Sequence, residues 1–523
     1  MTGAKKMSSG LDASDNARPT NWVTPTLGEV YTVVGGGTPS TEKADYWGTG
    51  TPWVTSADIY GVRDIKPRKQ VTTKGIENST TNVVPRKTLL VVTRVGLGKT
   101  AITEAKTCFS QDIQGLIQRS DFIMPEFALY FLSYELQILK HLGRGTTISG
   151  ITKKQLTDLK FPLPPYTEQQ RIVAKIEQML SELDKGVENL RTAQQQLRVY
   201  RHALLKHAFE GKLTADWREQ NPDKLESADA LQARIWQERE ARYQQQLQEW
   251  EVSGKTGREP KAPTVLRSLT AKELAALPEL PKGWAWQSIE PLLSFERKPM
   301  ATGPFGTLLS KSDYRPSGIP VLGIENIGDG AFVKGNKIFI SEEKSLELSS
   351  FAVEPGDLII SRSGTVGEIC KVPDCVGTAY ISTNLIRVTL NKEVVDPDYF
   401  VFLFQGGAVK QMVKDLCKGS SRAFLNQTIL SALSFPVPCL EEQRMIVSSL
   451  EEKLSIIDQL EQTITHSLQQ AEALRQSILK KAFSGQLVPQ APNDEPASVL
   501  LERIRAERAA QPRARGRKAK ASA

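Results

Sequence analysis

The sequence predicts an α/β (α+β) fold: two β-rich domains separated by two long antiparallel coiled-coil helices, with a pseudo-two-fold internal repeat. Three observations lead to this prediction. A 53-residue stretch occurs twice, each copy carries an apolar stripe at heptad spacing, and similar strand-rich segments precede both copies. The chain has 523 residues, too many for one hydrophobic core, so several structural units are expected.

The repeated stretch covers residues 161–213 and 435–487, at an offset of 274 residues. The copies align without a gap, and 20 of 53 positions are identical. Self-similarity of this kind indicates an internal duplication. Each copy opens with a proline-rich turn, after which Thr167 or Glu441 can begin a helix that acidic residues such as Glu168 stabilise at its N-terminus.

Each copy continues with an apolar stripe. Stepping alternately by four and three residues, seven of nine positions are apolar in each copy, which predicts a coiled-coil seam over about four heptads and a helix of roughly 60 Å. Two such helices in one chain pack most simply antiparallel, and separate burial of each against its own domain is the alternative. The predicted seam residues are Ile176, Leu180, Leu183, Val187, Leu190, Leu197, Leu204, Leu450, Leu454, Ile457, Ile464, Leu468 and Ile478.

The segments before the two copies also correspond. Residues 51–59 and 319–327 both read as a short strand after a turn, and an amphipathic helix, a Gly-Thr/Ser loop and a short helix precede each proline-rich turn. The predicted organisation is a flexible leader (1–20), a first β-rich domain (21–160), a first helical spacer (161–213), a helical extension and linker (214–281), a second β-rich domain (282–434), a second helical spacer (435–487), and a C-terminal helix with a basic tail (488–523).

The stretch GLGKT at 96–100 resembles the end of a phosphate-binding loop. That loop requires a glycine five residues before Gly98, where this chain has Thr93, and the second copy has Val366 and Gly367 in place of Gly98 and Lys99. β-Branched residues on both sides favour strand–turn–strand over strand–loop–helix. An ATP site is therefore not expected here.

The stretch LPPY at 163–166 resembles the amine-binding motif of amino-methyltransferases. The position that must accept a hydrogen bond from the target amine is Leu163, which cannot accept one, and the second copy has Val437 there. We interpret the motif as a helix-entry turn.

Composition excludes several classes of site. Five irregularly spaced cysteines and four scattered histidines predict neither a disulfide framework nor a metal site. No apolar run reaches the ~18 residues of a membrane span, and no apolar segment opens the chain, so a cytoplasmic protein is expected. The net charge is +8, and five of the positive charges lie in the last thirteen residues; this tail suits either nucleic acid or solubility.

Several segments together resemble the DNA specificity subunit of type I restriction–modification systems. They are residues 35–59, 303–327, the two helix entries FPLPPYTEQQRIV and FPVPCLEEQRMIV, and residues 498–510. The resemblance covers the chain from about Asn21 to Ala510. Residues 214–281 depart from it, with an extra helix predicted around Leu231–Glu251.

The resemblance implies a chain without chemistry of its own. Two target recognition domains would each read one half of a split, asymmetric site in double-stranded DNA, and the long helices would set the gap and hold two modification subunits. No cofactor is expected in this chain. S-adenosylmethionine, ATP and Mg²⁺ belong to the partners, namely the methyltransferase subunits and the motor-nuclease restriction subunits.

Polar and basic residues on predicted loops are the candidates for DNA contact, because such side chains read base edges and phosphates. Arg94 and Arg362 form the leading pair, since the duplication retains both on a turn predicted to be exposed; internal salt bridges are the alternative. Arg362→Ala is predicted to weaken DNA binding with little change in Tm. The candidates are Ser56, Asp58, Arg63, Lys66, Arg68, Lys69, Arg94, Lys99, Arg144 and Thr146 in the first half, and Lys311, Ser312, Tyr314, Asn326, Arg362, Ser363, Lys418, Ser420 and Arg422 in the second.

Two rival interpretations remain distinct from a DNA-reading scaffold. The chain could be a methyltransferase or ATPase with unfamiliar motifs, which predicts turnover with S-adenosylmethionine and DNA without added subunits. A purely structural coiled-coil linker predicts no preference for a cognate DNA sequence.

Overall fold

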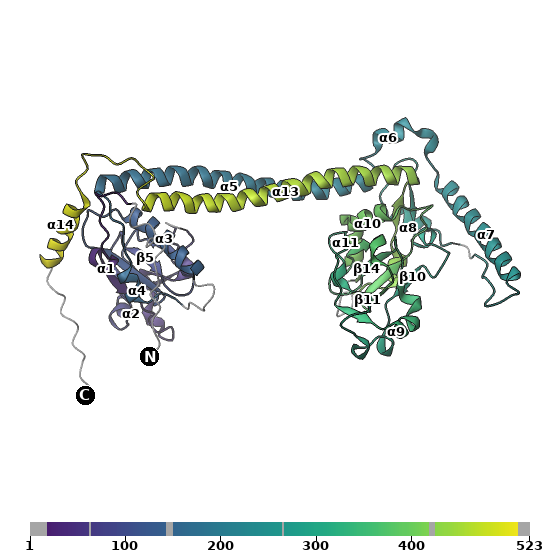
Figure 1. Cartoon of the computed structure of the whole chain (residues 1–523), viewed down its shortest axis with the longest axis horizontal. Coiled ribbons are helices and arrows are strands. Elements are labelled where there is room, and N and C mark those ends of the chain that lie inside the picture. Colours follow the sequence, from purple (N-terminus) through teal and green to yellow (C-terminus); the bar gives the residue numbers. More distant parts are fainter. Residues whose placement is uncertain (1–17, 62–63, 143–149, 264–265, 418–423, 511–523) are drawn as a thin grey trace. The chain divides into compact units, whose positions relative to one another are not determined.

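The computed structural model describes residues 18–61, 64–142, 150–263, 266–417 and 424–510. The chain divides into two compact units: unit 1 is Met1–Arg191 with Thr465–Ala523, and unit 2 is Thr192–Ile464. Each unit contains a β-rich domain and parts of both long helices (Figure 1). The units therefore meet inside the predicted helical spacers rather than at their ends.

Unit 1 carries two four-stranded sheets, one antiparallel in the order β1-β8-β5-β6 and one mixed in the order β3-β2-β7-β4. Short buried strands such as β5, with all four residues inside, form its core. The elements of the domain are α1 (Leu27–Val30), β1 (Tyr31–Gly35), η2 (Ala44–Tyr46), β2 (Trp47–Val54), η3 (Ser56–Asp58), β3 (Lys69–Val71), α2 (Thr73–Glu77), β4 (Val83–Val84), β5 (Leu89–Val92), β6 (Thr100–Ile102), β7 (Thr107–Phe109), β8 (Ile113–Gln118), α3 (Pro125–Leu142) and α4 (Lys153–Asp158).

Unit 2 repeats this topology with sheets β10-β17-β14-β15 and β12-β11-β16-β13, and adds the strand pair β18-β9. In both mixed sheets the central pair is parallel: β2 with β7, and β11 with β16. The elements are α6 (Ala215–Gln220), η5 (Pro222–Lys224), α7 (Ala228–Val252), α8 (Ala271–Ala275), β9 (Ala285–Gln287), η6 (Glu290–Leu292), β10 (Met300–Thr302), η7 (Gly306–Leu308), η8 (Lys311–Asp313), β11 (Ile319–Leu322), η9 (Ile324–Asn326), β12 (Ile338–Ile340), α9 (Glu342–Glu347), η10 (Ser349–Phe351), β13 (Ala352–Val353), β14 (Leu358–Ser361), β15 (Ile369–Lys371), η11 (Asp374–Val376), β16 (Ala379–Ile381), β17 (Leu385–Val388), α10 (Pro397–Gln405), α11 (Gly407–Cys417), α12 (Gln427–Ala432) and β18 (Phe435–Val437).

Two 44-residue helices link the units, α5 (Tyr166–Phe209) and α13 (Leu440–Phe483). Within unit 1 the first part of α5 lies against the last part of α13, and within unit 2 the second part of α5 lies against the first part of α13 (Figure 1). The helices are antiparallel in both. All thirteen predicted seam residues are buried or half-buried, and the predicted fold class, with its internal repeat, is confirmed.

Two polar interruptions of the seam form ion pairs between the helices. Arg475 pairs with Asp184 in unit 1, and Arg201 pairs with Asp458 in unit 2. The four residues are related by the offset of 274, so each repeat contributes one arginine and one aspartate. Because the two bonds are equivalent, the repeat preserves both the helix pairing and its register.

The C-terminal phenylalanine of each long helix anchors in the β-rich domain of its unit. Phe483 of α13 lies 5.5 Å, between ring centroids, from both Phe127 and Phe131 of α3. Its counterpart Phe209 lies 5.5 Å from Tyr399 of α10. Each unit therefore holds the start of one long helix and the end of the other.

The helix starts are fixed by a repeated Glu-Gln pair. Gln169 donates to the carbonyls of Phe122 and Pro164 and accepts from the Met124 backbone N–H. Its counterpart Gln443 makes the same set of bonds, to Val394, Pro438 and Asp396. The preceding acids, Glu168 and Glu442, are fully buried rather than exposed at the helix N-terminus as expected.

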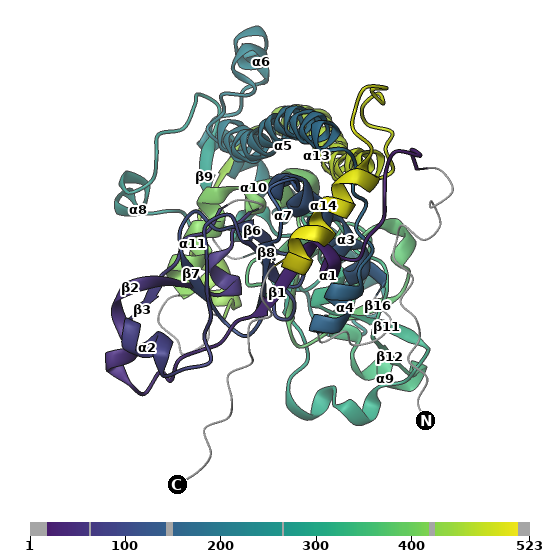
Figure 2. The same cartoon turned by 90° about the vertical axis from the view of Figure 1, so that its left-hand side faces the viewer.

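A small helix follows each long helix and covers the neighbouring domain. It is α7 in unit 2 and α14 (Ala497–Ala510) in unit 1, where Figure 2 shows α14 beside α1. Residues 226–239 and 495–508 align at an offset of 269 with seven of 14 identities. Equivalent pairs include the buried Leu231 and Leu500, the buried Ile235 and Ile504, and the ion pairs Arg234–Glu226 and Arg503–Glu495.

The extra helix predicted within 214–281 is thus confirmed as α7, but it is no departure from the repeat. Its first half duplicates α14, and only the part beyond about residue 241 lacks a counterpart.

The structure also settles the two misleading motifs. β5 and β6 form an antiparallel hairpin around GLGKT, with Gly96 and Gly98 at positive φ, so strand–turn–strand is confirmed. LPPY leads directly into α5, with Leu163 buried and bridged to Val23. Among the described residues, none of the helices has the length and apolarity needed to span a bilayer.

Candidate nucleic-acid interface

The turn after β2 gathers several candidates of unit 1. Asp58 is 2% exposed, and its carboxylate accepts bonds from the backbone and hydroxyl of Thr55, at 2.8 and 2.6 Å, and from Arg68 Nε at 2.7 Å. Burial alone would raise the pKa of Asp58, but these bonds outweigh burial and lower it. The candidate assignment of Asp58 as a base reader is wrong, because its carboxylate closes the turn internally.

The β5–β6 hairpin loop packs against the same turn. Lys99 Nζ donates to the carbonyls of Ser56 and Ile59, both at 2.9 Å. A Cβ on Gly96 would lie 3.7 Å from Ser56 Cβ. The lysine that resembles a phosphate-loop lysine therefore joins two loops, and the neighbouring Arg94 remains exposed.

Exposed cations surround this turn. Lys66 pairs with Asp64 at 3.1 Å and lies 5.5 Å above the Tyr60 ring centre. Arg68, bound through Nε to Asp58, has a 64% exposed side chain. The structure thus brings together Ser56, Lys66, Arg68, Lys69, Arg94 and Lys99, whose contact with DNA stays a prediction.

In unit 2 the equivalent turn is closed by Asn326. This residue is fully buried; its Oδ1 accepts from the Gly323 backbone, and its Nδ2 donates to the carbonyls of Val333 and Gly335, each at 3.0 Å. All its contacts are internal, so its assignment to DNA reading is wrong for the same reason as that of Asp58.

Arg362 also differs from the expectation. Only 3% of the residue is exposed, and its guanidinium lies 4.7 Å from the ring centre of Phe305 and 3.8 Å from that of Phe424. Desolvation lowers its pKa. The predicted exposed turn is wrong here, and so is the salt-bridge alternative for the described residues, because two phenyl rings hold the cation.

The other described candidates of unit 2 lie at its surface. Lys311, Ser312 and Tyr314 are exposed on or beside η8, and half-buried Ser363 donates to Asn384 Oδ1 at 2.8 Å. Candidates that lie outside the described residues are Arg63, Arg144, Thr146, Lys418, Ser420 and Arg422.

Sequence reasoning missed the aromatic residues at these surfaces. Phe305 is 57% exposed and Phe424 37% exposed in unit 2, and Trp47 and Gln70 line a pocket in unit 1. An aromatic residue next to a run of basic residues, as in Trp47 with 68–69, was the available signal for a nucleic-acid site.

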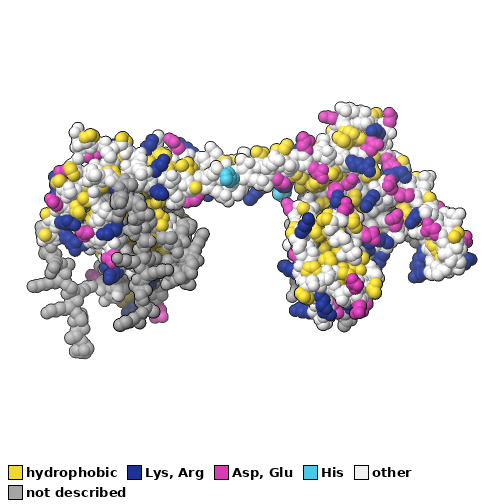
Figure 3. All heavy atoms as spheres, in the orientation of Figure 1, with side chains coloured by type: hydrophobic (Ala, Val, Ile, Leu, Met, Phe, Trp, Pro, Cys, Tyr) yellow, Lys and Arg dark blue, Asp and Glu magenta, His cyan; other side chains and the backbone are white. Residues whose placement is uncertain are grey.

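No cluster of metal-ligand type occurs among the residues that the structure describes. In the face shown in Figure 3, basic and acidic side chains are interspersed over α7 and the adjoining surface of unit 2. Any DNA contact there would depend on particular side chains rather than on a uniform charge.

Comparison with known proteins gives a family match. The model of the type I restriction modification DNA specificity domain matches residues 19–192 and 305–470, that is, one segment in each repeat. The chain is 26% identical over 399 residues to the EcoDI specificity subunit of Escherichia coli, covering 74% of this chain and 78% of that protein. The EcoBI specificity subunit of the same species is 24% identical over 374 residues, covering 70% and 68%.

Solved structures share the fold. A chain from a study of complex assembly and conformational transition of a type I R-M system superposes with a TM-score of 0.61 at 17% identity, covering 90% of this chain and 99% of that one. The HsdS subunit from Thermoanaerobacter tengcongensis has a TM-score of 0.50 at 18% identity, covering 90% and 98%.

Proposed function

Because the chain belongs to the type I restriction–modification DNA specificity domain family, we propose that it reads the two halves of an asymmetric DNA site, one half with each unit. It does so as the non-catalytic subunit of a restriction–modification complex in the cytoplasm.

One observation carries the proposal: the two units share a fold but not a polar surface. The turns after β2 and β11 are closed by buried caps at equivalent positions, Asp58 and Asn326. Around them unit 1 presents Arg94 and Arg68 to solvent, whereas unit 2 buries Arg362 between aromatic rings. Equal frames with unlike contact residues suit two unlike half-sites.

The long helices give the proposal its geometry. A helical rod sets the separation of two readers, as dimer geometry sets half-site spacing. Tyr200 of α5 and Leu474 of α13 occupy equivalent positions and are 52% and 50% exposed. Repeated apolar positions of this kind suit two copies of one partner, so the methyltransferase subunits would dock there and recruit the motor-nuclease subunits, with S-adenosylmethionine, ATP and Mg²⁺ bound by the partners.

Selection from a pool of random duplexes tests the DNA-reading role. The purified chain is expected to enrich two fixed sequences of different composition at a constant separation. Enrichment of neither sequence would contradict the proposal. Labelled S-adenosylmethionine added to the same duplexes tests the enzyme alternative, for which methyl transfer by the chain alone is the expected result.

A further inference from the structure

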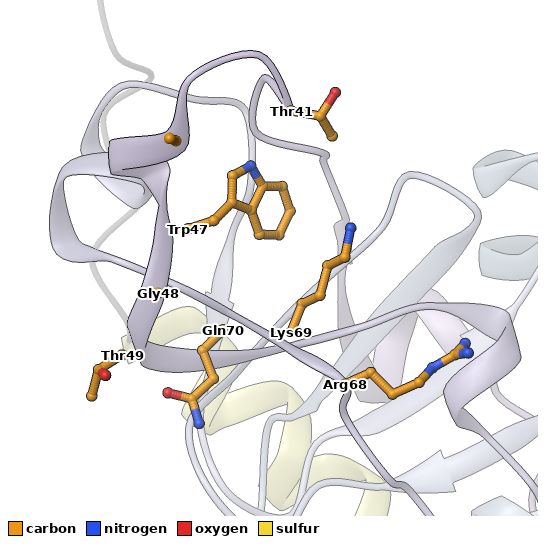
Figure 4. Close-up of a pocket in the computed structure, with 8 residues that line it drawn as sticks. Thr41, Trp47, Gly48, Thr49, Arg68, Lys69 and Gln70 are labelled. Atoms are coloured by element: carbon orange, nitrogen blue, oxygen red, sulfur yellow. The ribbon is translucent and has the colours of Figure 1, made fainter.

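A bulge in β2 of unit 1 opens a pocket on the domain surface. Trp47 and Thr51 both pair with Val71 of β3, so residues 48–50 lie outside the ladder. A Cβ on Gly50 would lie 2.2 Å from the Val71 carbonyl oxygen, so the close approach requires glycine. The pocket encloses about 660 Å³ (Figure 4) and is lined by Thr41, Ala44, Trp47, Gly48, Thr49, Arg68, Lys69 and Gln70.

One wall of the pocket is a fixed indole. Trp47 Nε1 donates to the Ser40 carbonyl at 3.0 Å, and the ring meets Trp53 edge-on, with centroids 5.1 Å apart at 81°. Trp53 is itself buried, and its Nε1 donates to the Gly37 carbonyl at 3.1 Å. The orientation of Trp47 is therefore set before any ligand arrives, which lowers the entropy cost of binding.

The opposite wall is cationic. Lys69 Nζ lies 5.3 Å from the Trp47 ring centre, and within the described parts of the chain no carboxylate forms an ion pair with it. Arg68 is anchored through Nε by Asp58 and has a largely exposed side chain. Gln70 Oε1 accepts the Gly50 backbone N–H at 2.8 Å and so holds the bulge.

We propose that this pocket receives one unstacked DNA base, with Trp47 stacking on the base and Arg68 and Lys69 contacting its phosphate. The inference rests on the proposed DNA-reading function. The volume lies within the ~300–1,000 Å³ typical of small-molecule pockets and exceeds what a phosphate alone needs. Stacking of a base on an aromatic ring contributes roughly ten- to hundredfold in affinity.

Unit 2 has no equivalent arrangement in its described residues. Arg315 occupies the position of Trp47 at the offset of 268, and β11 pairs with β12 in unbroken register. The pocket would therefore act on one half-site only.

The test uses the full chain and its selected cognate duplex. Variants of the duplex carry an abasic site opposite each base of both half-sites in turn. A base without a partner costs less to extrude, so one position is expected to tighten wild-type binding by about tenfold. Trp47→Ala should lose this gain and Trp47→Phe should keep most of it, whereas Trp236→Ala, which removes an exposed indole on α7, should leave it unchanged.

The cationic wall has its own readout. Lys69→Gln should weaken binding to every duplex and lower the salt dependence by about one phosphate contact, while the position-specific gain remains. A cognate preference with no abasic position that tightens binding would overturn the pocket assignment and leave the proposed function standing. A uniform loss in Trp47→Ala with the gain retained would likewise overturn it, because only backbone contact would remain. Absence of any cognate preference in the wild type would instead overturn the proposed function.

Discussion

Arg362 is a buried cation whose charge is compensated by aromatic rings rather than by an acid. Its guanidinium contacts Phe305 and Phe424, its Nη1 lies 3.4 Å from the Thr383 carbonyl, and its Nε has no hydrogen-bond partner among the described residues. A desolvated cation–π contact is worth about 2 kcal/mol, which offsets part of the burial cost. The side chain thereby ties together three loops distant in sequence.

We therefore expect Arg362→Ala to lower Tm by about 5 °C, because two ring contacts worth roughly 2 kcal/mol or more are lost. Arg94→Ala is the matched control, since Arg94 is the exposed repeat counterpart and its loss should change Tm by less than about 1 °C. Thermal melts of the two variants check this. Equal Tm values would show that the ring contacts contribute nothing. The small Tm change expected from the sequence alone does not suit a buried side chain.

Glu168 is a buried acid at the start of α5. Its Oε1 accepts bonds from Trp22 Nε1 at 3.0 Å and from Gln490 Nε2 at 2.6 Å, while Oε2 has no partner among the described residues. Burial raises the pKa of Glu168 above its ordinary value of 4.5, against the opposing effect of these two bonds. The folded state therefore holds the proton more tightly than the unfolded chain does.

The sign of the pH dependence follows from that shift. The stabilising contribution of Glu168 is fully present below pH 4.5 and is lost as the pH rises through the raised folded pKa. Glu168→Gln should thus be more stable than the wild type at pH 8, with the difference shrinking toward pH 4.5. Melts across this range, with the exposed Glu188→Gln on the same helix as control, measure it. A difference that does not vary with pH would refute the ionisation argument.

At the scale of elements, the ion pairs between α5 and α13 fix the register of two otherwise simple apolar stripes. Arg201 pairs with Asp458 through side chains that are 24% and 55% exposed. Pairs this exposed contribute at most about 1 kcal/mol, so their main effect is on which register is preferred. Buried or half-buried polar residues in a seam are known to specify register at little gain in stability.

Exchange of the charges tests this pair. Asp458→Arg should lower Tm by about 2 °C, and adding Arg201→Asp should restore most of the loss. The same exchange at Arg475 and Asp184 provides a matched cycle in unit 1. If the double variant is no more stable than the sum of the two single variants predicts, the pair does not couple the helices.

Elements were predictable where the repeat keeps a constant offset. The long helices keep 20 of 53 residues at 274, and their stripe has helical period. The equivalence of α7 and α14 was missed because its offset is 269, so a shift of five residues breaks the alignment. The roles of Asp58 and Arg362 differ in kind. The Thr55-x-x-Asp58 spacing is a readable local cap, whereas Phe305 and Phe424 lie 57 and 62 residues from Arg362, and no local pattern predicts such contacts.

At the scale of the whole molecule, the proposed spacer role can be tested by lengthening both helices together. Seven residues inserted after Gln194 of α5 and seven after Ile464 of α13 would keep the apolar stripes in phase. One heptad adds about 10.5 Å, equivalent to about 3 bp of DNA at 3.4 Å per step. We expect the selected separation to grow by roughly that amount, as measured by methylome sequencing of cells carrying the complete system. Insertion in α5 alone should also change the tolerated gap. An unchanged methylated sequence from a stable complex would count against a spacer.

The division of the chain has a consequence for its synthesis. The core of unit 1 joins Phe127 and Phe131 to Phe483 and extends to Leu500 and Ile504, so more than 300 residues must leave the ribosome between its first and last parts. Unit 2 is one continuous stretch, Thr192–Ile464. Nascent chains usually fold in the order in which they are translated; here the later-starting half can be finished first, while the earlier half waits for the last segment with part of its apolar surface uncovered.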